Sequence, residues 1–194
     1  MSNVHSAPQV AGLAAFNALG AEEAEAELLA CCACRGFAAK VAALRPYRDP
    51  GRLTEVAEAT VRSLDWSGVR EALAAHPRIG EPPRESDPAA GHSGREADWS
   101  RREQSGVETA GREVLDRLAE GNRAYERRFG HVYLICATGL PAEEMLARLT
   151  ERLGNDEDTE RDVVRAELGK ITRLRLVKLL ESGHLAPVLP RTAT

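Results

Sequence analysis

One histidine occupies a position that the sequence predicts to lie on a buried helix face. His76 comes seven residues after Val69 and three after Leu73, so a helix would carry all three on one side. Pro77 follows directly and ends the helix. An imidazole on a buried face can transfer protons. The structural alternative is a helix-end cation that complements the helix dipole.

A guanidinium and a carboxylate occupy comparable positions later in the chain. Arg175 comes four residues after Ile171 and seven after Leu168, which places it on the apolar stripe of its helix. There it either presents a two-pronged donor to a carboxylate or serves only packing and ion pairing. Glu103 completes the pattern Ser100-x-x-Glu103, which is typical of a capping box. A helix beginning at Ser100 could also receive an anionic ligand.

These three groups together would form an acid–base pair and an anion clamp that needs no metal. His131 is a possible fourth member, although a structural role fits it better, and His92 lies in a polar stretch where it would be solvated. Cys31 and Cys34 form a C-x-x-C motif without a second ligand pair, so we interpret them as reduced thiols and not as a zinc site. The sequence also lacks the H-x-x-x-H spacing of many metal hydrolases.

The elements that position these groups are expected to be helices, because the amino-acid composition favours helical structure. Charged residues make up 29% of the chain and aromatic residues 4%, with few of the residue types that strands prefer. Residues 131–139 are an apolar run that fits either a buried strand or a helical segment. In the first half of the chain we predict helices at 11–19, 22–44 and 52–64, and one more that ends at His76. In the second half we predict a helix from Ser100 to 130 with a bend near Gly106 or Gly111, and a helix that contains Met145 and Leu149. The last predicted helix covers 157–182, with Gly183 as its C-cap.

The 194 residues suit one all-α domain, a helical bundle with a single apolar core. We expect a flexible N-terminal arm at 1–10, the domain at 11–183 with a long loop at 80–98, and a tail at 184–194. The net charge of -4 argues against a nucleic-acid partner. No segment has the apolar length of a membrane span and no secretion signal is evident, so we predict a cytoplasmic protein without a membrane partner.

Several short motifs, in this order and at compatible spacing, resemble the OHCU decarboxylase family over roughly residues 12–182. OHCU is 2-oxo-4-hydroxy-4-carboxy-5-ureidoimidazoline, an intermediate of urate catabolism. The main departure from the family pattern is the enlarged loop at 81–98. The motifs are CC-x-C followed by LRPY, HPRIG at 76–80, S-x-x-EQ-x-G at 100–106, N-x-x-Y-x-x-RFG at 122–130, ICA at 135–137 and KI-x-x-LRL at 170–176.

This resemblance implies an all-α homodimer that uses neither a metal nor an organic cofactor. The implied reaction is a carboxy-lyase step that converts OHCU to (S)-allantoin and CO2. By correspondence of motifs, the catalytic residues are His76 and Glu103. The implied substrate-binding residues are Pro77, Ser100, Gln104, Tyr133, Leu134, Ile135, Ala137 and Arg175.

The mechanistic hypothesis is that Arg175 anchors the substrate while His76, held by Glu103, moves a proton. Two alternatives differ from it. In a helical interaction module without catalysis, the inward polar groups would only specify packing. In a decarboxylase of a related ureido or hydantoin-like acid, the long loop would accommodate a different substrate.

Overall fold

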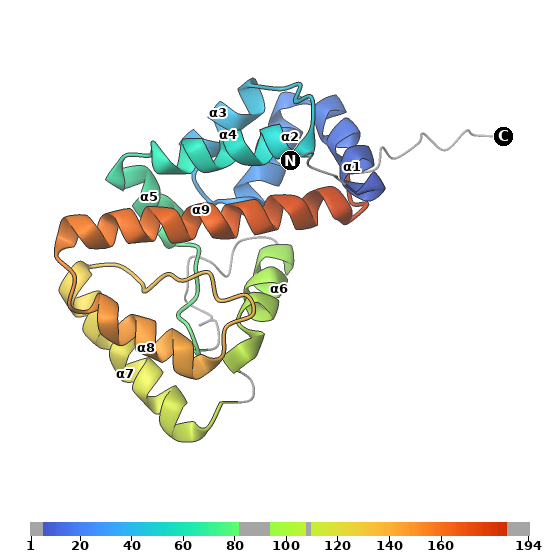
Figure 1. Ribbon diagram of the computed structural model, residues 1–194. Coiled ribbons are helices and arrows are strands. Elements are labelled where there is room, and N and C mark those ends of the chain that lie inside the picture. The colour runs from blue at the N-terminus through green and yellow to red at the C-terminus, as the bar shows by residue number, and fades with distance from the viewer. Residues whose placement is uncertain (1–5, 82–93, 108–109, 186–194) are drawn as a thin grey trace.

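The longest helix, α9 (Glu157–Glu181), crosses the middle of the molecule and separates two groups of helices (Figure 1). Helices α1 to α4 lie on one side and α6 to α8 on the other. In the computed structural model, the described residues are 6–81, 94–107 and 110–185, with side chains from residue 98 in the second range. These residues contain helices but no strand, which confirms the predicted all-α class.

The remaining helices are shorter than α9, and α1, α4 and α5 each begin at a residue whose side chain caps the first turn. Asp49 caps α4 and Asp65 caps α5, because each side chain accepts a hydrogen bond from a backbone N–H in the first turn. In chain order the elements are α1 (Ala7–Ala18), α2 (Ala21–Cys31), α3 (Arg35–Ala43), α4 (Pro50–Arg62), α5 (Trp66–Leu73), α6 (Gly94–Glu103), the 3-10 helix η2 (Ser105–Val107), α7 (Arg112–Phe129), α8 (Ala142–Arg152) and α9.

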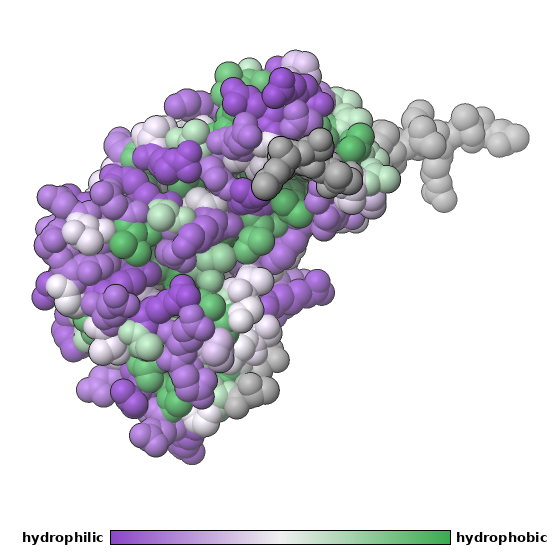
Figure 2. All heavy atoms as spheres, viewed as in Figure 1, coloured by the Kyte–Doolittle hydropathy of each residue, from purple (hydrophilic) through white to green (hydrophobic). Residues whose placement is uncertain are grey.

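Two hydrophobic clusters, and not the single core predicted, stabilise this arrangement. The first joins α1 to α5 with α9 and includes Phe16, Phe37 and Leu168. The second joins α7 and α8 with the chain between them and includes Leu118 and Met145. Helical periodicity identifies the buried face of each helix but does not say which helices share a core, so the prediction of one core was wrong. Hydrophilic side chains cover most of the face shown in Figure 2.

In the N-terminal half of the chain, the helices differ from the prediction at two places. Ser6 accepts a hydrogen bond from the Gln9 N–H, so α1 begins at Ala7 and residues 7–10 are helical instead of part of an arm. The single helix predicted for 22–44 is wrong, because Cys32 is extended and the chain turns before α3 begins. This turn directs Cys32 and Cys34 into the first cluster, and neither glycine nor proline marks it in the sequence.

In the middle of the chain, the predicted helix start at Ser100 is wrong. Helix α6 already begins at Gly94, so residues 94–98 of the predicted loop are helical and Ser100 lies inside the helix. The capping-box interpretation of Ser100 and Glu103 is therefore wrong. The predicted long helix to 130 is interrupted around Gly106, where a Cβ atom would overlap the carbonyl oxygen of Leu140. Most of the predicted loop, including His92, lies outside the described residues.

The other predicted helices agree with the structure within a few residues. The predicted helices at 52–64 and 157–182 correspond to α4 and α9, and Gly183 follows the cap of α9 with a φ of +65°. Helix α5 ends at Leu73, although the N–H of His76 still donates to the Leu73 carbonyl at 3.0 Å. Residues 131–139 form neither of the two predicted structures. Over the described parts of the chain, no helix is long and apolar enough to cross a membrane.

Candidate functional site

One pocket brings together all ten residues that the sequence predicted for a site. It lies where the two hydrophobic clusters meet, since Leu134 and Ile171 belong to the first and Ile79 and Tyr133 to the second. Its free volume is about 20 Å³, close to the room that one water molecule needs. A ring-sized ligand therefore requires its side chains to move apart. The lining residues are His76, Pro77, Ile79, Ser100, Glu103, Gln104, Tyr133, Leu134, Ile135, Ala137, Thr138, Ile171 and Arg175.

The orientation of His76 is fixed by the backbone of α5. Its Nδ1 lies 2.9 Å from the carbonyl oxygen of Ala72. A carbonyl oxygen only accepts, so this contact assigns the proton to Nδ1 and leaves a lone pair on Nε2. Nε2 is buried and has no hydrogen-bond partner among the described residues. Burial and the nearby charge of Arg175 lower the pKa of His76 to about 4. The ring is therefore neutral at pH 7, with an unused basic nitrogen.

Arg175 and Glu103 form a buried ion pair between α9 and α6. Nε of Arg175 donates to one carboxylate oxygen at 3.2 Å, and Nη2 donates to the other at 2.9 Å. Lys178, one turn further along α9, also donates to Glu103 at 3.1 Å. Burial raises the pKa of Glu103, but the hydrogen bonds and charges of these two cations outweigh it and hold the pKa below its usual range. One carboxylate between two cations leaves a net positive charge beside the pocket.

These contacts correct the predicted arrangement in which Glu103 holds His76. Glu103 bonds to Arg175 and Lys178, and the partner of the imidazole is the Ala72 carbonyl. Lys178 was not predicted as part of this group, because the helical spacing placed it further round α9 than Arg175. A lysine has a reach that the position of its backbone does not reveal.

Ser100 and Gln104 contact the pocket from the C-terminal end of α6. The Ser100 hydroxyl accepts a hydrogen bond from Nη2 of Arg175 at 3.1 Å. Oε1 of Gln104 accepts from the backbone N–H of Gly80 at 3.2 Å. The first bond helps to orient the guanidinium and the second joins α6 to the turn that follows His76. None of the described residues accepts a hydrogen bond from Nη1 of Arg175.

The turn after His76 is attached to α7. Asn122 donates to the Ile79 carbonyl at 2.8 Å. Arg78 forms a two-pronged pair with Glu126, with donor–acceptor distances of 2.5 and 2.6 Å. Gly80 has a φ of +78°, a conformation that suits glycine. This turn therefore holds Pro77, at the pocket wall, in a defined position, which gives the HPRIG motif a structural explanation.

The chain between α7 and α8 lines the pocket without regular structure, and two side chains hold its backbone. Nη1 of Arg152 donates to the Leu134 carbonyl at 2.7 Å, and Glu167 accepts from the Cys136 N–H at 2.7 Å. Sequence reasoning missed both anchors. Their only signal was a charged residue at a helical position facing apolar neighbours, which the sequence shows at many other positions.

His131 lies outside the pocket, in an aromatic group. Its ring packs edge-on against Trp66 and Tyr125, with centroid distances of 5.2 and 5.4 Å. Its Nδ1 lies 3.0 Å from the Val132 carbonyl. Burial lowers its pKa, so the ring is neutral. These contacts favour the structural interpretation of His131 over membership of the site.

The cysteines also lie apart from the pocket lining. Cys31, Cys32 and Cys34 are buried and unoxidised, and burial raises the pKa of Cys32 to about 12. Such thiols are poor nucleophiles at neutral pH. Within the described ranges, no group of three or more His, Cys, Asp or Glu side chains could hold a metal ion.

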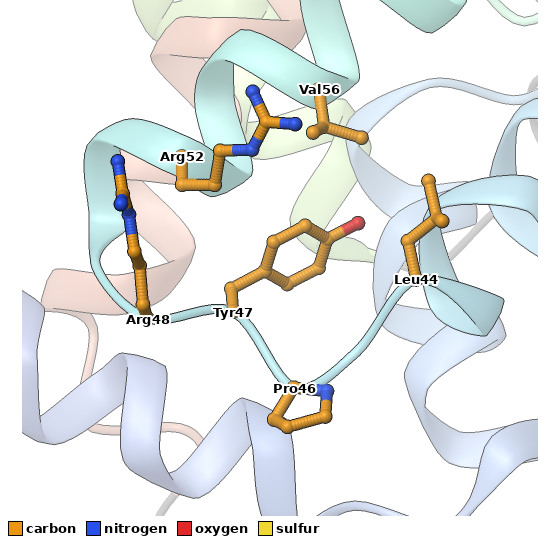
Figure 3. A pocket seen from close by; sticks show the side chains of 6 residues that line it. All are labelled: Leu44, Pro46, Tyr47, Arg48, Arg52 and Val56. Atoms are coloured by element: carbon orange, nitrogen blue, oxygen red, sulfur yellow. The ribbon is translucent and has the colours of Figure 1, made fainter.

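A second pocket, of about 430 Å³, lies where the chain passes from α3 to α4, with Tyr47 at its centre (Figure 3). Its polar side chains already have partners. The Tyr47 hydroxyl donates to a backbone carbonyl, Arg48 pairs with Asp49, and Arg52 pairs with Glu55. Its remaining lining residues are Leu44, Pro46 and Val56. The smaller pocket is therefore the better candidate for a reaction site, because there Nε2 of His76 has no hydrogen-bond partner within the described ranges.

Two curated proteins of known name are similar to this chain. A uric acid degradation bifunctional protein TTL from Arabidopsis thaliana is 32% identical over 162 residues, which are 81% of this chain and 48% of the relative. A 2-oxo-4-hydroxy-4-carboxy-5-ureidoimidazoline decarboxylase from Amia calva is 40% identical over 77 residues, which are 37% of this chain and 44% of the relative. The chain thus spans about half the length of these curated relatives.

Solved structures show the same fold. An OHCU decarboxylase crystallised in the presence of (S)-allantoin matches with a TM-score of 0.65 and 28% identity, over 80% of this chain and 97% of that one. An (S)-allantoin synthase matches with a TM-score of 0.61 over 86% of this chain and 53% of that one; at 17% identity it shows the fold alone. The family model of OHCU decarboxylase matches residues 17–177. The chain therefore belongs to the OHCU decarboxylase family.

Proposed function

We propose that this protein decarboxylates OHCU to (S)-allantoin and CO2 without a cofactor. The observation that carries the proposal is one pocket in which a neutral His76, whose Nε2 has no partner in the described parts of the chain, lies beside the positively charged group of Arg175, Glu103 and Lys178. Family membership and the relatives named for this reaction support the same substrate.

The excess positive charge suits the substrate carboxylate. Arg175 is buried and oriented by Glu103 and Ser100, so its guanidinium is already in place for a further acceptor. Its Nη1 has no acceptor among the described residues and is the donor we assign to an oxygen of the substrate. Glu103 is a positioning residue in this proposal, because it fixes Arg175 and adds negative potential near His76.

The chemistry consists of one bond cleavage and three proton movements. The bond between C4 and the carboxylate breaks, CO2 leaves, and the electron pair moves into the ring towards its imine nitrogen, which takes up a proton from solvent and leaves an enol-like species. Nε2 of His76 accepts the proton of the C4 hydroxyl, which becomes a carbonyl, and a proton is added to the ring carbon that carries the ureido group, so that the reaction takes up one proton overall. Addition to one face gives the S product. Because the ring itself takes up the electrons, positioning and electrostatics are the protein's contribution.

A chiral assay tests this proposal directly. The substrate is generated enzymatically in situ from urate, and product formation is followed by circular dichroism with and without the protein. We expect faster formation of optically active (S)-allantoin than in the spontaneous reaction, which supplies the baseline. A trace that the protein leaves unchanged would overturn the proposed function.

Two alternative functions give different results in binding experiments. A helical interaction module predicts no thermal shift with (S)-allantoin, and the family membership disfavours it. A decarboxylase of a related ureido acid predicts turnover of that acid with a higher kcat/KM than OHCU. The loop that permits this second alternative lies largely outside the described residues.

The assembly and compartment of the protein are further proposals. The family resemblance supports a homodimer, which sedimentation equilibrium tests by mass. The sequence supports a cytoplasmic location, which fractionation of the native host tests. A monomer at working concentration, or recovery in another fraction, would contradict the respective proposal.

A further inference from the structure

The pocket segment formed by residues 133–137 depends on side chains for its position. It belongs to no helix or strand, so no ladder of backbone hydrogen bonds fixes it. Figure 1 shows the chain between α7 and α8 running alongside α9. Arg152 holds the Leu134 carbonyl from α8, and Glu167 holds the Cys136 N–H from α9. These side-chain bonds act on alternate residues of the segment.

Glu167 connects this segment to the helix that carries Arg175. It lies four residues before Ile171 and eight before Arg175, and both of these line the pocket. Eight residues of α-helix span about 12 Å. The Glu167 side chain is buried, with one oxygen 2.7 Å from the Cys136 nitrogen and the other 2.5 Å from Nζ of Lys170. Lys170 itself is mostly exposed.

We propose that Glu167 is a positioning residue, which fixes the pocket segment relative to Arg175. The inference rests on the proposed function and deepens it. The bond between Glu167 and the Cys136 N–H holds the middle of the segment against α9. The neighbouring N–H groups of Ile135 and Ala137 have no acceptor among the described residues, so both are available to a bound ligand.

The Glu167→Ala variant tests this role with two kinds of measurement. Its backbone effect is read from amide hydrogen exchange by NMR, which should become faster at Cys136 and its neighbours while α9 stays protected. Its functional effect is read from kcat, KM and the enantiomeric excess of allantoin. We expect kcat/KM to fall about tenfold to 100-fold through displaced donors, mostly through KM, with a lower excess of the S product.

Two further variants separate positioning from charge and from stability. Glu167→Gln keeps an oxygen that can accept from Cys136, so it should restore most of the exchange protection and kcat/KM. Lys170→Ala removes the exposed ion pair but keeps the bond to Cys136, and should behave as wild type in both measurements. Failure of Glu167→Gln to restore activity at unchanged protection would overturn the proposal.

The outcomes distinguish this proposal from the proposed function. An inactive wild-type protein overturns the decarboxylase assignment, and the anchor is then judged by exchange alone. Faster exchange at Cys136 in Glu167→Ala supports it, and unchanged exchange overturns it. With an active wild type, a Glu167→Ala variant with faster exchange and unaltered kinetics also overturns it.

Discussion

Two buried arginine–glutamate pairs in this protein differ in the other groups that contact them. Arg152 and Glu160 lie eight residues apart, and their nearest atoms are 2.5 Å apart. Arg152 balances the charge of the Glu160 carboxylate, and the Tyr125 hydroxyl and the Asn155 amide donate hydrogen bonds to its oxygens. Arg175 and Glu103 lie 72 residues apart, with Lys178 as a second cation. That pair keeps an excess positive charge and lines a pocket.

From this difference we infer that the Arg152 pair stabilises the fold, and we propose that the Arg175 pair binds a ligand. Arg152 donates to the Leu134 carbonyl and packs 4.7 Å from the centre of the Tyr133 ring, so its polar and apolar surfaces are both in use. A buried pair of this kind is costly to break because an unpaired charge remains. The pair at Arg175 has capacity for a further anion, which is what a substrate-binding site requires.

The largest expected effect comes from His76, which belongs to the ligand-binding side of this comparison. His76→Ala should lower turnover about 10²–10⁴-fold, the usual contribution of a positioned proton-transfer group. This corresponds to about 3–5 kcal/mol in the barrier. Initial rates with in situ substrate, on protein whose helical circular dichroism matches wild type, provide the measurement. A folded variant that keeps most of its turnover would show that His76 is not the base.

Glu160→Ala should have the largest effect on stability. The change leaves Arg152 without its carboxylate in a buried site, at a cost of about 3–5 kcal/mol in the free energy of unfolding. Denaturant titration measures it. Glu157→Ala is the matched control, because it removes an exposed partner of Arg161 on the same helix and should cost less than about 1 kcal/mol. Equal losses of unfolding free energy in the two variants would mean that the buried network stabilises the fold no more than an exposed ion pair does.

The pH dependence of stability tests the neutral state of His76. Its pKa is about 4 in the folded protein against an ordinary 6.5. Between these values the unfolded chain binds a proton that the folded chain does not, so stability falls as the pH drops from 6.5 towards 4. The expected loss is up to about 3 kcal/mol. Unfolding titrations at pH 7 and pH 4.5 measure it, and His76→Gln should remove this part of the slope. An identical slope in the variant would contradict a buried, neutral ring.

Arg175→Lys should have a smaller effect that separates charge from shape. Lysine keeps the charge but cannot bond both oxygens of Glu103 and the Ser100 hydroxyl together. We expect kcat/KM to fall by roughly tenfold, about 1.4 kcal/mol. Steady-state kinetics check this value, with Arg173→Lys on the same helix as the exposed control. Equal kinetics for Arg175→Lys and wild type would assign Arg175 to structure alone.

The sequence predicted which residues line one pocket better than it predicted the packing around that pocket. Helical spacing placed His76 and Arg175 on buried faces, and short family motifs identified Glu103 and Gln104. These signals are local. The partner of Glu103 was predicted wrongly, because which of several charged neighbours it contacts depends on how α6 and α9 cross. The anchors Arg152 and Glu167 were missed for the same reason, since their partners are backbone groups without a sequence signature.

The errors in the fold have a similar cause. The break between α2 and α3 follows from the burial of Cys32 and Cys34 in a shared core, a tertiary effect that overrides the helical propensity of the surrounding residues. The capping box predicted at Ser100 and Glu103 was wrong for the opposite reason, because a local sequence pattern was present but did not form the local structure. Ser100 and Glu103 have the spacing of a cap, but their side chains contact Arg175 from the interior of α6. A local pattern was assigned a local role where the structure gives it a tertiary one.

Ser100→Ala should have the smallest effect, and its pattern separates these two roles. A helix cap would lose stability while each folded molecule kept its activity. In the structure the hydroxyl instead accepts from Nη2 of Arg175, so its loss should raise KM about fivefold, the equivalent of one hydrogen bond of about 1 kcal/mol. Ser105→Ala, at an exposed position beyond α6, is the control and should leave KM unchanged. A Ser100→Ala variant with wild-type KM and lower stability would restore the capping interpretation and remove Ser100 from the group that orients Arg175.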